Sequence, residues 1–143
     1  MSIIIEKIVA HTDSGVRAIV NHAGQKLDVG VAGPIGRIAD VLGQSLTVEV
    51  GYSAVADWRI LEHDSESAHG LFQVDGQAGD VRVVGRVHNV LTIDDSRSVF
   101  DVYTQAGPEY LAFDSADISG RQPKIGDPIS ATLHDLYFYP TWT

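Results

Sequence analysis

Histidine and carboxylate side chains gather in one short stretch of the chain, residues 61–69. Its sequence places His63, Asp64, Glu66 and His69 within a few positions of one another. Imidazole and carboxylate groups can jointly hold a divalent metal ion. The two histidines are six positions apart, which does not match the four-residue spacing of a helical metal-binding pair. Because charged residues normally collect in surface loops, we interpret the stretch as a solvated loop and predict no metal and no other cofactor.

Nucleophilic chemistry has little support in the sequence. The stretch Gly51-Tyr-Ser-Ala-Val55 contains Ser53 but lacks the second glycine of a nucleophile elbow. No Walker loop or dinucleotide-binding fingerprint occurs. With 0 cysteines, the chain has no thiolate nucleophile, no thiolate metal ligand and no disulfide. We therefore predict no catalytic residues and expect a non-enzymatic protein.

Basic and aromatic residues alternate in the second half of the chain. Single-stranded nucleic acid is bound by aromatic rings that stack on bases and by basic side chains that track the backbone. The residues of these types are Arg82, Arg86, His88, Phe100, Tyr103 and Tyr110. Strand alternation predicts that many of these aromatics face a core. An alternative prediction, nucleic-acid binding, rests on four of them: Arg82, Arg86, His88 and Tyr103.

Acidic residues dominate the middle of the chain. The formal net charge is -9, from 10 Lys+Arg and 19 Asp+Glu. Residues 61–80 contain no Lys or Arg, and their carboxylates are Glu62, Asp64, Glu66, Asp75 and Asp80. This balance argues against broad binding of phosphate backbones, which depends on Lys and Arg. It suits a basic protein partner, so we predict these carboxylates as partner-binding residues.

The elements that must position these side chains are mostly strands. Segments rich in Ile, Val, Tyr and Phe recur along the chain, separated by Gly, Pro, Asp, Asn and Ser, which is typical of an all-β protein. A helix is predicted between Pro34 and Gly43, and a turn or a single helical turn at 114–119. Strands are expected at about 3–10, 16–21, 26–31, 46–52, 58–61, 81–93, 99–104, 110–113 and 129–139.

The two halves of the chain share a register. A shift of 83 residues aligns Ala23-Gly24 with Ala106-Gly107 and Gly43 with Gly126, and many apolar positions align with them. Each half then consists of three strands, a short helix or turn, a fourth strand and a closing strand. Self-similarity at a fixed period predicts an internal duplication.

In this order of elements each half resembles an OB-fold barrel. The second half carries the resemblance best, through the long strand Val81-Arg-Val-Val-Gly85-Arg-Val-His-Asn-Val90 and a last strand that follows Lys124-Ile-Gly-Asp-Pro-Ile129. A glycine inside a long strand lets the sheet bend as a small barrel requires. The resemblance covers about 60 residues and implies two related OB-like barrels. A single β-sandwich or one larger barrel is the alternative.

The expected organisation is a first OB-like unit at 1–61, an acidic connecting segment at 62–80 and a second OB-like unit at 81–143. The chain ends on the aromatic stretch Leu136-Tyr-Phe-Tyr-Pro-Thr-Trp142. Such a stretch must pack on something to stay out of water. We expect it to pack on its own barrel, the second one, or otherwise on a second protein chain.

Together these features favour a non-enzymatic protein-interaction module, such as an acidic inhibitor or immunity-type protein that masks a basic partner. The alternatives are an OB-type single-stranded nucleic-acid-binding protein and an unrecognised small hydrolase. The N-terminus lacks a positively charged leader, and no run approaches the roughly 18 apolar residues of a membrane span. We therefore expect a soluble, cytoplasmic protein with no membrane partner.

Overall fold

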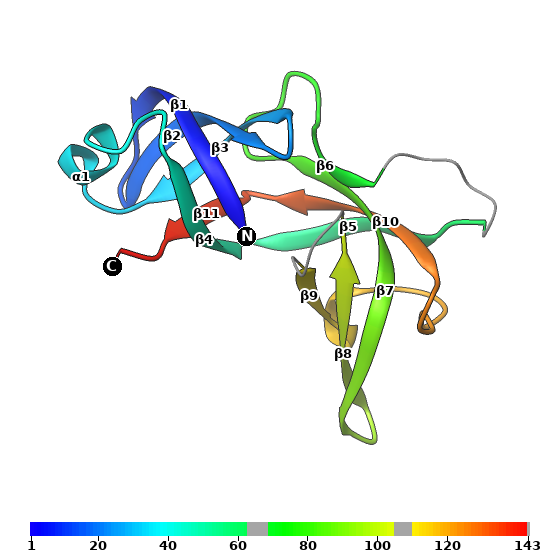
Figure 1. The fold of residues 1–143 in the computed structure, drawn as a ribbon. Coiled ribbons are helices and arrows are strands. Elements are labelled where there is room, and N and C mark those ends of the chain that lie inside the picture. The colour runs from blue at the N-terminus through cyan, green and yellow to red at the C-terminus, as the bar shows by residue number, and fades with distance from the viewer. Residues whose placement is uncertain (63–68, 105–109, 143) are drawn as a thin grey trace. The chain divides into compact units, whose positions relative to one another are not determined.

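The computed structural model describes residues 1–62, 69–104 and 110–142, and it confirms the all-β class (Figure 1). Two compact units interleave along the sequence. Unit 1 comprises residues 1–53, 72–81 and 133–143, and unit 2 comprises residues 54–71 and 82–132. None of the helices in the described ranges is long and apolar enough to cross a membrane.

Unit 1 is built around a closed barrel. Its strands are β1 (Ser2–His11), β2 (Gly15–His22), β3 (Gln25–Ala32), β4 (Ser45–Gly51) and β11 (Tyr137–Pro140). They follow the order β1-β2-β3-β11-β4, and β4 returns to β1. The β3–β11 pair is parallel, whereas the other pairs are antiparallel. This closed five-stranded barrel is compatible with an OB-like fold.

Alternation of apolar residues explains how the barrel of unit 1 fills its core. In β2, Val16, Ala18 and Val20 are fully buried, while Arg17 between them is exposed. Successive side chains of a strand point to opposite faces, so each strand contributes every second residue to the interior. The largest core side chains from these strands are Ile3, Ile5, Leu27 and Phe138.

The predicted helix forms as α1 (Ile35–Ala39), between β3 and β4. It is shorter than the apolar spacing suggested, because Ile38 is the one buried residue of α1. Leu42, in the turn that follows, is about 40% exposed. One buried side chain gives too little apolar contact to extend the helix towards Gly43.

The aromatic chain end packs on the barrel of unit 1, not on the second unit to which the sequence assigned it. Phe138 of β11 pairs with Val31 of β3 on one side and with Val50 of β4 on the other. Leu136 and Phe138 are fully buried. Thus β11 supplies the strand that closes the barrel begun by β1–β4, and the boundaries of the two compact units differ from the sequential division at 61 and 81.

Unit 2 contains a sheet in the order β5-β10-β7-β8-β9, with β6 also paired to β7. These strands are β5 (Ala54–Ile60), β6 (Gly70–Gln73), β7 (Val81–Asp94), β8 (Arg97–Tyr103), β9 (Tyr110–Asp114) and β10 (Pro128–His134). A 3-10 turn, η1 (Ser115–Asp117), follows β9 where a single helical turn was predicted. The core includes Val83, Val87, Phe100, Val102, Leu111, Phe113 and Ile129. Strand β6 lies inside the stretch that the sequence predicted as a connecting segment.

Trp58 of β5 contacts Phe113 of β9 within unit 2. It packs edge-to-face on Phe113, with ring centroids 5.4 Å apart and an interplanar angle of 61°. The two strands are the ends of the sheet order. Their contact at this point therefore comes from an aromatic pair, whose geometry is a favoured one.

Candidate functional site

Three strands of unit 2 bring aromatic rings to one exposed face. In β8, Phe100 and Val102 are fully buried, so Tyr103, one position beyond Val102, points to the opposite face. Tyr103 lies opposite Arg86 of β7 and opposite Tyr110 of β9. Cross-strand register therefore forms a row from Arg86 through Tyr103 to Tyr110.

The rings in this row are stacked. His88 lies on Tyr103 with centroids 4.1 Å apart and planes 20° apart. Tyr103 and Tyr110 are also nearly parallel, at 18°, with centroids 6.0 Å apart. A register shift between Val87 and Asn89 marks a β-bulge in β7, and such bulges re-aim side chains. We call His88, Tyr103 and Tyr110 the aromatic ladder. Tyr110 is 53% exposed, so the ladder ends in an accessible ring face.

Arg86 lies opposite Tyr103 in the register of β7 and β8, and both predicted arginines of β7 are held by neighbouring groups. Arg82 donates from Nε to the Ser130 hydroxyl at 3.0 Å. Arg86 donates from Nη1 to the carbonyl of Gly126 at 2.6 Å. A guanidinium has five N–H donors, so each arginine retains donors for a further acceptor. Unit 2 thus places Arg82, Arg86, His88 and Tyr103, the residues predicted for nucleic-acid binding, on β7 and β8.

A carboxylate also lies on this face. Asp101 occupies the outward-facing positions of β8 together with Tyr103, because Phe100 and Val102 face inward. It lies opposite Asn89 in β7 and Ala112 in β9. The face therefore combines flat rings and the Arg86 guanidinium with the negative charge of Asp101, and Asp101 opposes any anion that approaches.

The acidic residues predicted for partner binding divide between the two units. Glu62 of unit 2 and Asp75 of unit 1 are exposed. Asp80 of unit 1 is half-buried, and its Oδ1 lies 3.0 Å from Nδ1 of His134. Asp64 and Glu66 lie outside the described residues. Asp80 is thus engaged within unit 1, whereas Glu62 and Asp75 present their carboxylates to solvent.

The histidine-rich stretch can be followed only at its end. His63, Asp64 and Glu66 lie outside the described residues, and His69 lies just before β6. Within the described ranges there is no group of three or more histidine, cysteine, aspartate or glutamate side chains that could hold a metal ion.

Ser53 serves a turn in unit 1. Its hydroxyl contacts the Asp135 carboxylate at 2.8 Å and the backbone carbonyl of His134 at 3.2 Å. The imidazole of His134 instead contacts Asp80. A serine–histidine pair needs a hydrogen bond from the hydroxyl to an imidazole, and among the described residues the Ser53 hydroxyl contacts Asp135 and the backbone of His134 instead. This geometry fixes the turn between β10 and β11.

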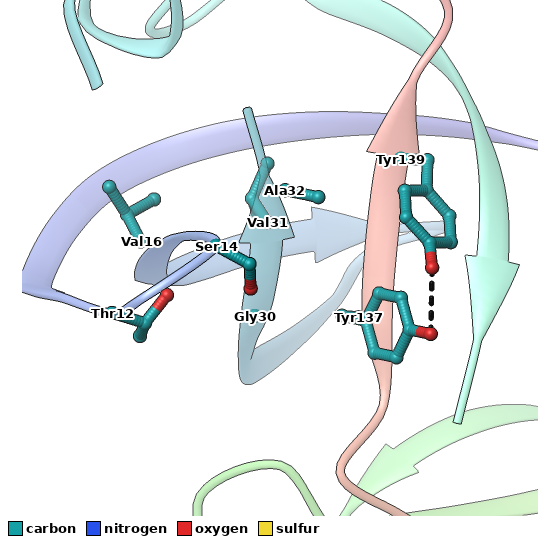
Figure 2. Close-up of a pocket in the computed structure, with 8 residues that line it drawn as sticks. All are labelled: Thr12, Ser14, Val16, Gly30, Val31, Ala32, Tyr137 and Tyr139. Carbon is teal, nitrogen blue, oxygen red and sulfur yellow. Dashed lines mark hydrogen bonds between the residues drawn. The ribbon is translucent and has the colours of Figure 1, made fainter. Parts of the chain in front are cut away.

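A recess of about 390 Å³ opens beside β11 in unit 1 (Figure 2). It lies between the β1–β2 turn, the end of β3 and two tyrosines of β11 (Figure 2). Its lining residues are Thr12, Ser14, Val16, Gly30, Val31, Ala32, Tyr137 and Tyr139. The wall therefore offers hydroxyl groups and apolar surface, without a charged side chain.

The two tyrosines of this recess are hydrogen-bonded to each other. The Tyr139 hydroxyl donates to the Tyr137 hydroxyl at 2.7 Å (Figure 2). This hydrogen bond raises the pKa of Tyr139 above its ordinary value, because it stabilises the protonated phenol. An added Cβ at Gly51 would lie 2.5 Å from Cζ of Tyr137, which means that the absence of a side chain at position 51 makes room for the ring.

Sequence reasoning left out several residues that contribute to these surfaces. Tyr110 was considered but not included among the predicted site residues, although it forms the exposed end of the aromatic ladder. Its position could have been found from alternation, because Leu111 and Phe113 of the same strand read as core residues. Tyr137 and Tyr139 were noted only as part of an aromatic chain end.

Comparison of the chain with protein-family models, with curated proteins and with solved structures found no match.

Proposed function

We propose that the protein is a non-enzymatic binding module that takes single-stranded nucleic acid on the outer face of β7, β8 and β9 in unit 2. The observation that carries this proposal is the aromatic ladder, in which parallel rings of His88, Tyr103 and Tyr110 cross adjacent strands. Bases stack on such rings whatever their sequence, because every base has a π-face. Duplex DNA keeps its bases stacked inside and cannot use the ladder in this way.

Stacking supplies more of the binding energy than charge does in this proposal. Loss of one stacking ring costs about 1–3 kcal/mol per base. Arg82 and Arg86 can neutralise at most about two phosphates, which gives a slope of log K against log salt no steeper than about −1.4. The net charge of -9 opposes any larger electrostatic contribution. We therefore expect binding that is only weakly sensitive to salt.

The test is a fluorescence-anisotropy titration of a labelled single-stranded oligonucleotide at about physiological salt. The expected dissociation constant is micromolar or tighter. Tyr110→Ala should weaken binding about 5- to 150-fold, the equivalent of one lost stacking contact. Tyr139→Ala is the matched control, because Tyr139 is a similarly exposed tyrosine (42% against 53%) that lies in unit 1. A dissociation constant of about 10⁻⁴ M or weaker, the level of non-specific contact, would overturn the proposal.

A basic protein partner is the second candidate. It is favoured by the exposed carboxylates Glu62 and Asp75 in a chain of net charge -9. Such a field speeds the encounter with a cationic protein. Neutralising Glu62, Asp64, Glu66, Asp75 and Asp80 together should then slow association with a basic protein recovered from the native cell, and it should leave oligonucleotide binding intact.

We also propose that the two units arose from one ancestral unit by internal duplication, with exchange of the last strand. A shift of 83 residues carries the pair Val16–Val31 of β2 and β3 onto the pair Val99–Asp114 of β8 and β9. The same shift carries Ser45–Gly51 onto Pro128–His134, the bounds of β4 and β10. It carries the start of β5 onto the start of β11. Yet β5 neighbours β10, and β11 neighbours β4 and β3, so each half contributes its last strand to the sheet of the other.

A further inference from the structure

A second recess, of about 290 Å³, lies in unit 2 beside β5. Its lining residues are Trp58, Arg59 and Ile60 of β5 together with Ser119, Gly120 and Arg121, which follow η1. No carboxylate is among them. The aromatic ladder and its arginines do not line this recess, so it is a separate feature of the same unit.

The two arginines of the recess differ from other arginines of the chain in their contacts with described residues. Arg17 pairs with Asp28, and Arg97 pairs with Asp114. By contrast, neither Arg59 nor Arg121 makes an ion pair or a side-chain hydrogen bond within the described ranges. The chain has 19 Asp+Glu against 10 Lys+Arg, so carboxylates outnumber the cations that could pair with them. The two guanidinium groups both line this recess, and no carboxylate among the lining residues balances their positive charge.

Trp58, which lines the recess, also carries a neutral donor without a partner among the described residues. The indole Nε1 of Trp58 is buried and has no hydrogen-bond partner among the described residues. Buried polar groups are normally paired, and an exception calls for an explanation such as an absent ion or ligand. Ser119 adds a hydroxyl, and the positive φ of Gly120 (82°), with open space where a Cβ would lie, leaves its backbone approachable.

We propose that this recess binds a phosphate group through Arg59 and Arg121. Guanidinium groups match phosphate in a bidentate geometry, and two of them balance the double negative charge of a phosphate monoester. The volume is at the lower end of the range of ligand sites, which fits a small phosphate ester rather than a large cofactor. The phosphate can belong to a free small molecule or to the 5′ end of a strand held on the aromatic ladder.

The experiment is isothermal titration of the full-length protein with inorganic pyrophosphate as the probe. Saturable binding is expected, and Arg59→Gln and Arg121→Gln should each weaken it at least tenfold. Arg37→Gln removes the same charge at an exposed side chain that does not line the recess, and it should leave pyrophosphate binding unchanged. Circular dichroism of each variant checks the fold, and quenching or enhancement of Trp58 fluorescence in a Trp142→Phe background gives a second readout.

Two oligonucleotides that differ only in a 5′-phosphate distinguish the sources of the phosphate. A 5′-phosphate that strengthens binding in wild type but not in Arg121→Gln assigns the recess to a strand end. Pyrophosphate binding without any effect of the 5′-phosphate assigns it to a free phosphate ester. The proposal is overturned if pyrophosphate does not bind and the 5′-phosphate has no effect, or if Arg37→Gln weakens pyrophosphate binding as much as Arg59→Gln. Binding of the 5′-hydroxyl strand tests the ladder alone, so the two proposals fail separately.

Discussion

The imidazole of His88 lies flat on the ring of Tyr103, with centroids 4.1 Å apart, although the two residues come from different strands. The bulge in β7 at this point and the register of β7 with β8 hold both rings in place. A platform that is ordered before its ligand arrives saves the entropy of ordering side chains on binding. The aromatic ladder is therefore suited to bind a flat ring with little rearrangement.

Charge on this face should tune affinity in opposite directions. Arg86→Ala removes an attraction for phosphate, whereas Asp101→Asn removes a repulsion from the same face. We expect the first variant to weaken and the second to strengthen oligonucleotide binding, each by a few-fold, in anisotropy titrations at low salt. A basic protein ligand on this face would reverse both signs, and high salt should reduce both effects.

The backbone at Gly85 sets the position of Tyr103. An added Cβ at Gly85 would lie 2.5 Å from the carbonyl oxygen of Tyr103 and 2.7 Å from Cγ1 of Val102. Gly85→Ala should therefore destabilise the protein by about 1–3 kcal/mol, the usual cost of overpacking, and it should weaken oligonucleotide binding. Urea denaturation measures the first effect. Gly36→Ala in α1, where nothing lies within 4 Å, is the control, and it should be neutral or stabilise by up to about 1 kcal/mol.

The ion pair between Arg97 and Asp114 makes stability depend on pH. The hydrogen bond from Arg97 holds the pKa of the Asp114 carboxyl below its ordinary value. A group whose pKa is lowered by folding stabilises the native state above its unfolded pKa of about 3.9 and loses this contribution as pH falls through the lowered value. Asp114→Asn should therefore destabilise the protein at pH 7 and have little effect near pH 2.

The asparagine variant keeps an oxygen that can accept the hydrogen bond from the Ala116 amide, which Asp114 accepts at 3.0 Å. Urea denaturation of the variant and of wild type at several pH values measures the effect. In an Arg97→Gln background the substitution at Asp114 should show a smaller pH dependence, because only the hydrogen bond from the Ala116 amide then still lowers the pKa of the Asp114 carboxyl. If the two backgrounds gave the same dependence, a partner other than Arg97 would be responsible.

Exchange of the last strands predicts that the halves of the chain depend on each other. Residues 1–62 contain β5, which neighbours β10, and residues 69–143 contain β11, which lies between β3 and β4. Each fragment alone lacks a strand of its sheet and should unfold without cooperativity. Mixed, they should form an equimolar complex that size-exclusion chromatography and circular dichroism detect. Two fragments that fold separately and do not associate would contradict the exchange.

The sequence predicted most of the strands, although not β6, and it did not predict which strands lie side by side. The strand predicted at 81–93 is β7, and the mid-strand Gly85 has the close backbone contact that a bend requires. Alternation tells which face a residue occupies, yet it carries no information on which strand lies alongside. The stretch predicted as one strand at 129–139 is two, β10 and β11, with Asp135 at a positive φ of 52° between them. This break separates β10 from β11, the strand that lies between β3 and β4 in the barrel of unit 1.

The sequence predicted which residue types could form the nucleic-acid-binding face, but it predicted less well which of their side chains are exposed. The aromatics of the second half were expected mostly in the core, and Phe100 is there. Tyr103 is three positions further along the same strand, an odd separation, so it must point outward when Phe100 points inward. Stacking of His88 on Tyr103 depends on the bulge in β7, and a bulge leaves no clear mark in a single sequence.

Photo-crosslinking of an oligonucleotide that carries 4-thiothymidine, followed by mass spectrometry of the crosslinked peptides, tests the proposed function most directly. The aromatic ladder predicts crosslinks to peptides that contain His88, Tyr103 or Tyr110, with loss of the Tyr110 crosslink in Tyr110→Ala and retention of all of them in Tyr139→Ala. Crosslinks confined to unit 1, or the same pattern in wild type and in a variant that carries Tyr103→Ala and Tyr110→Ala, would contradict nucleic-acid binding at this face.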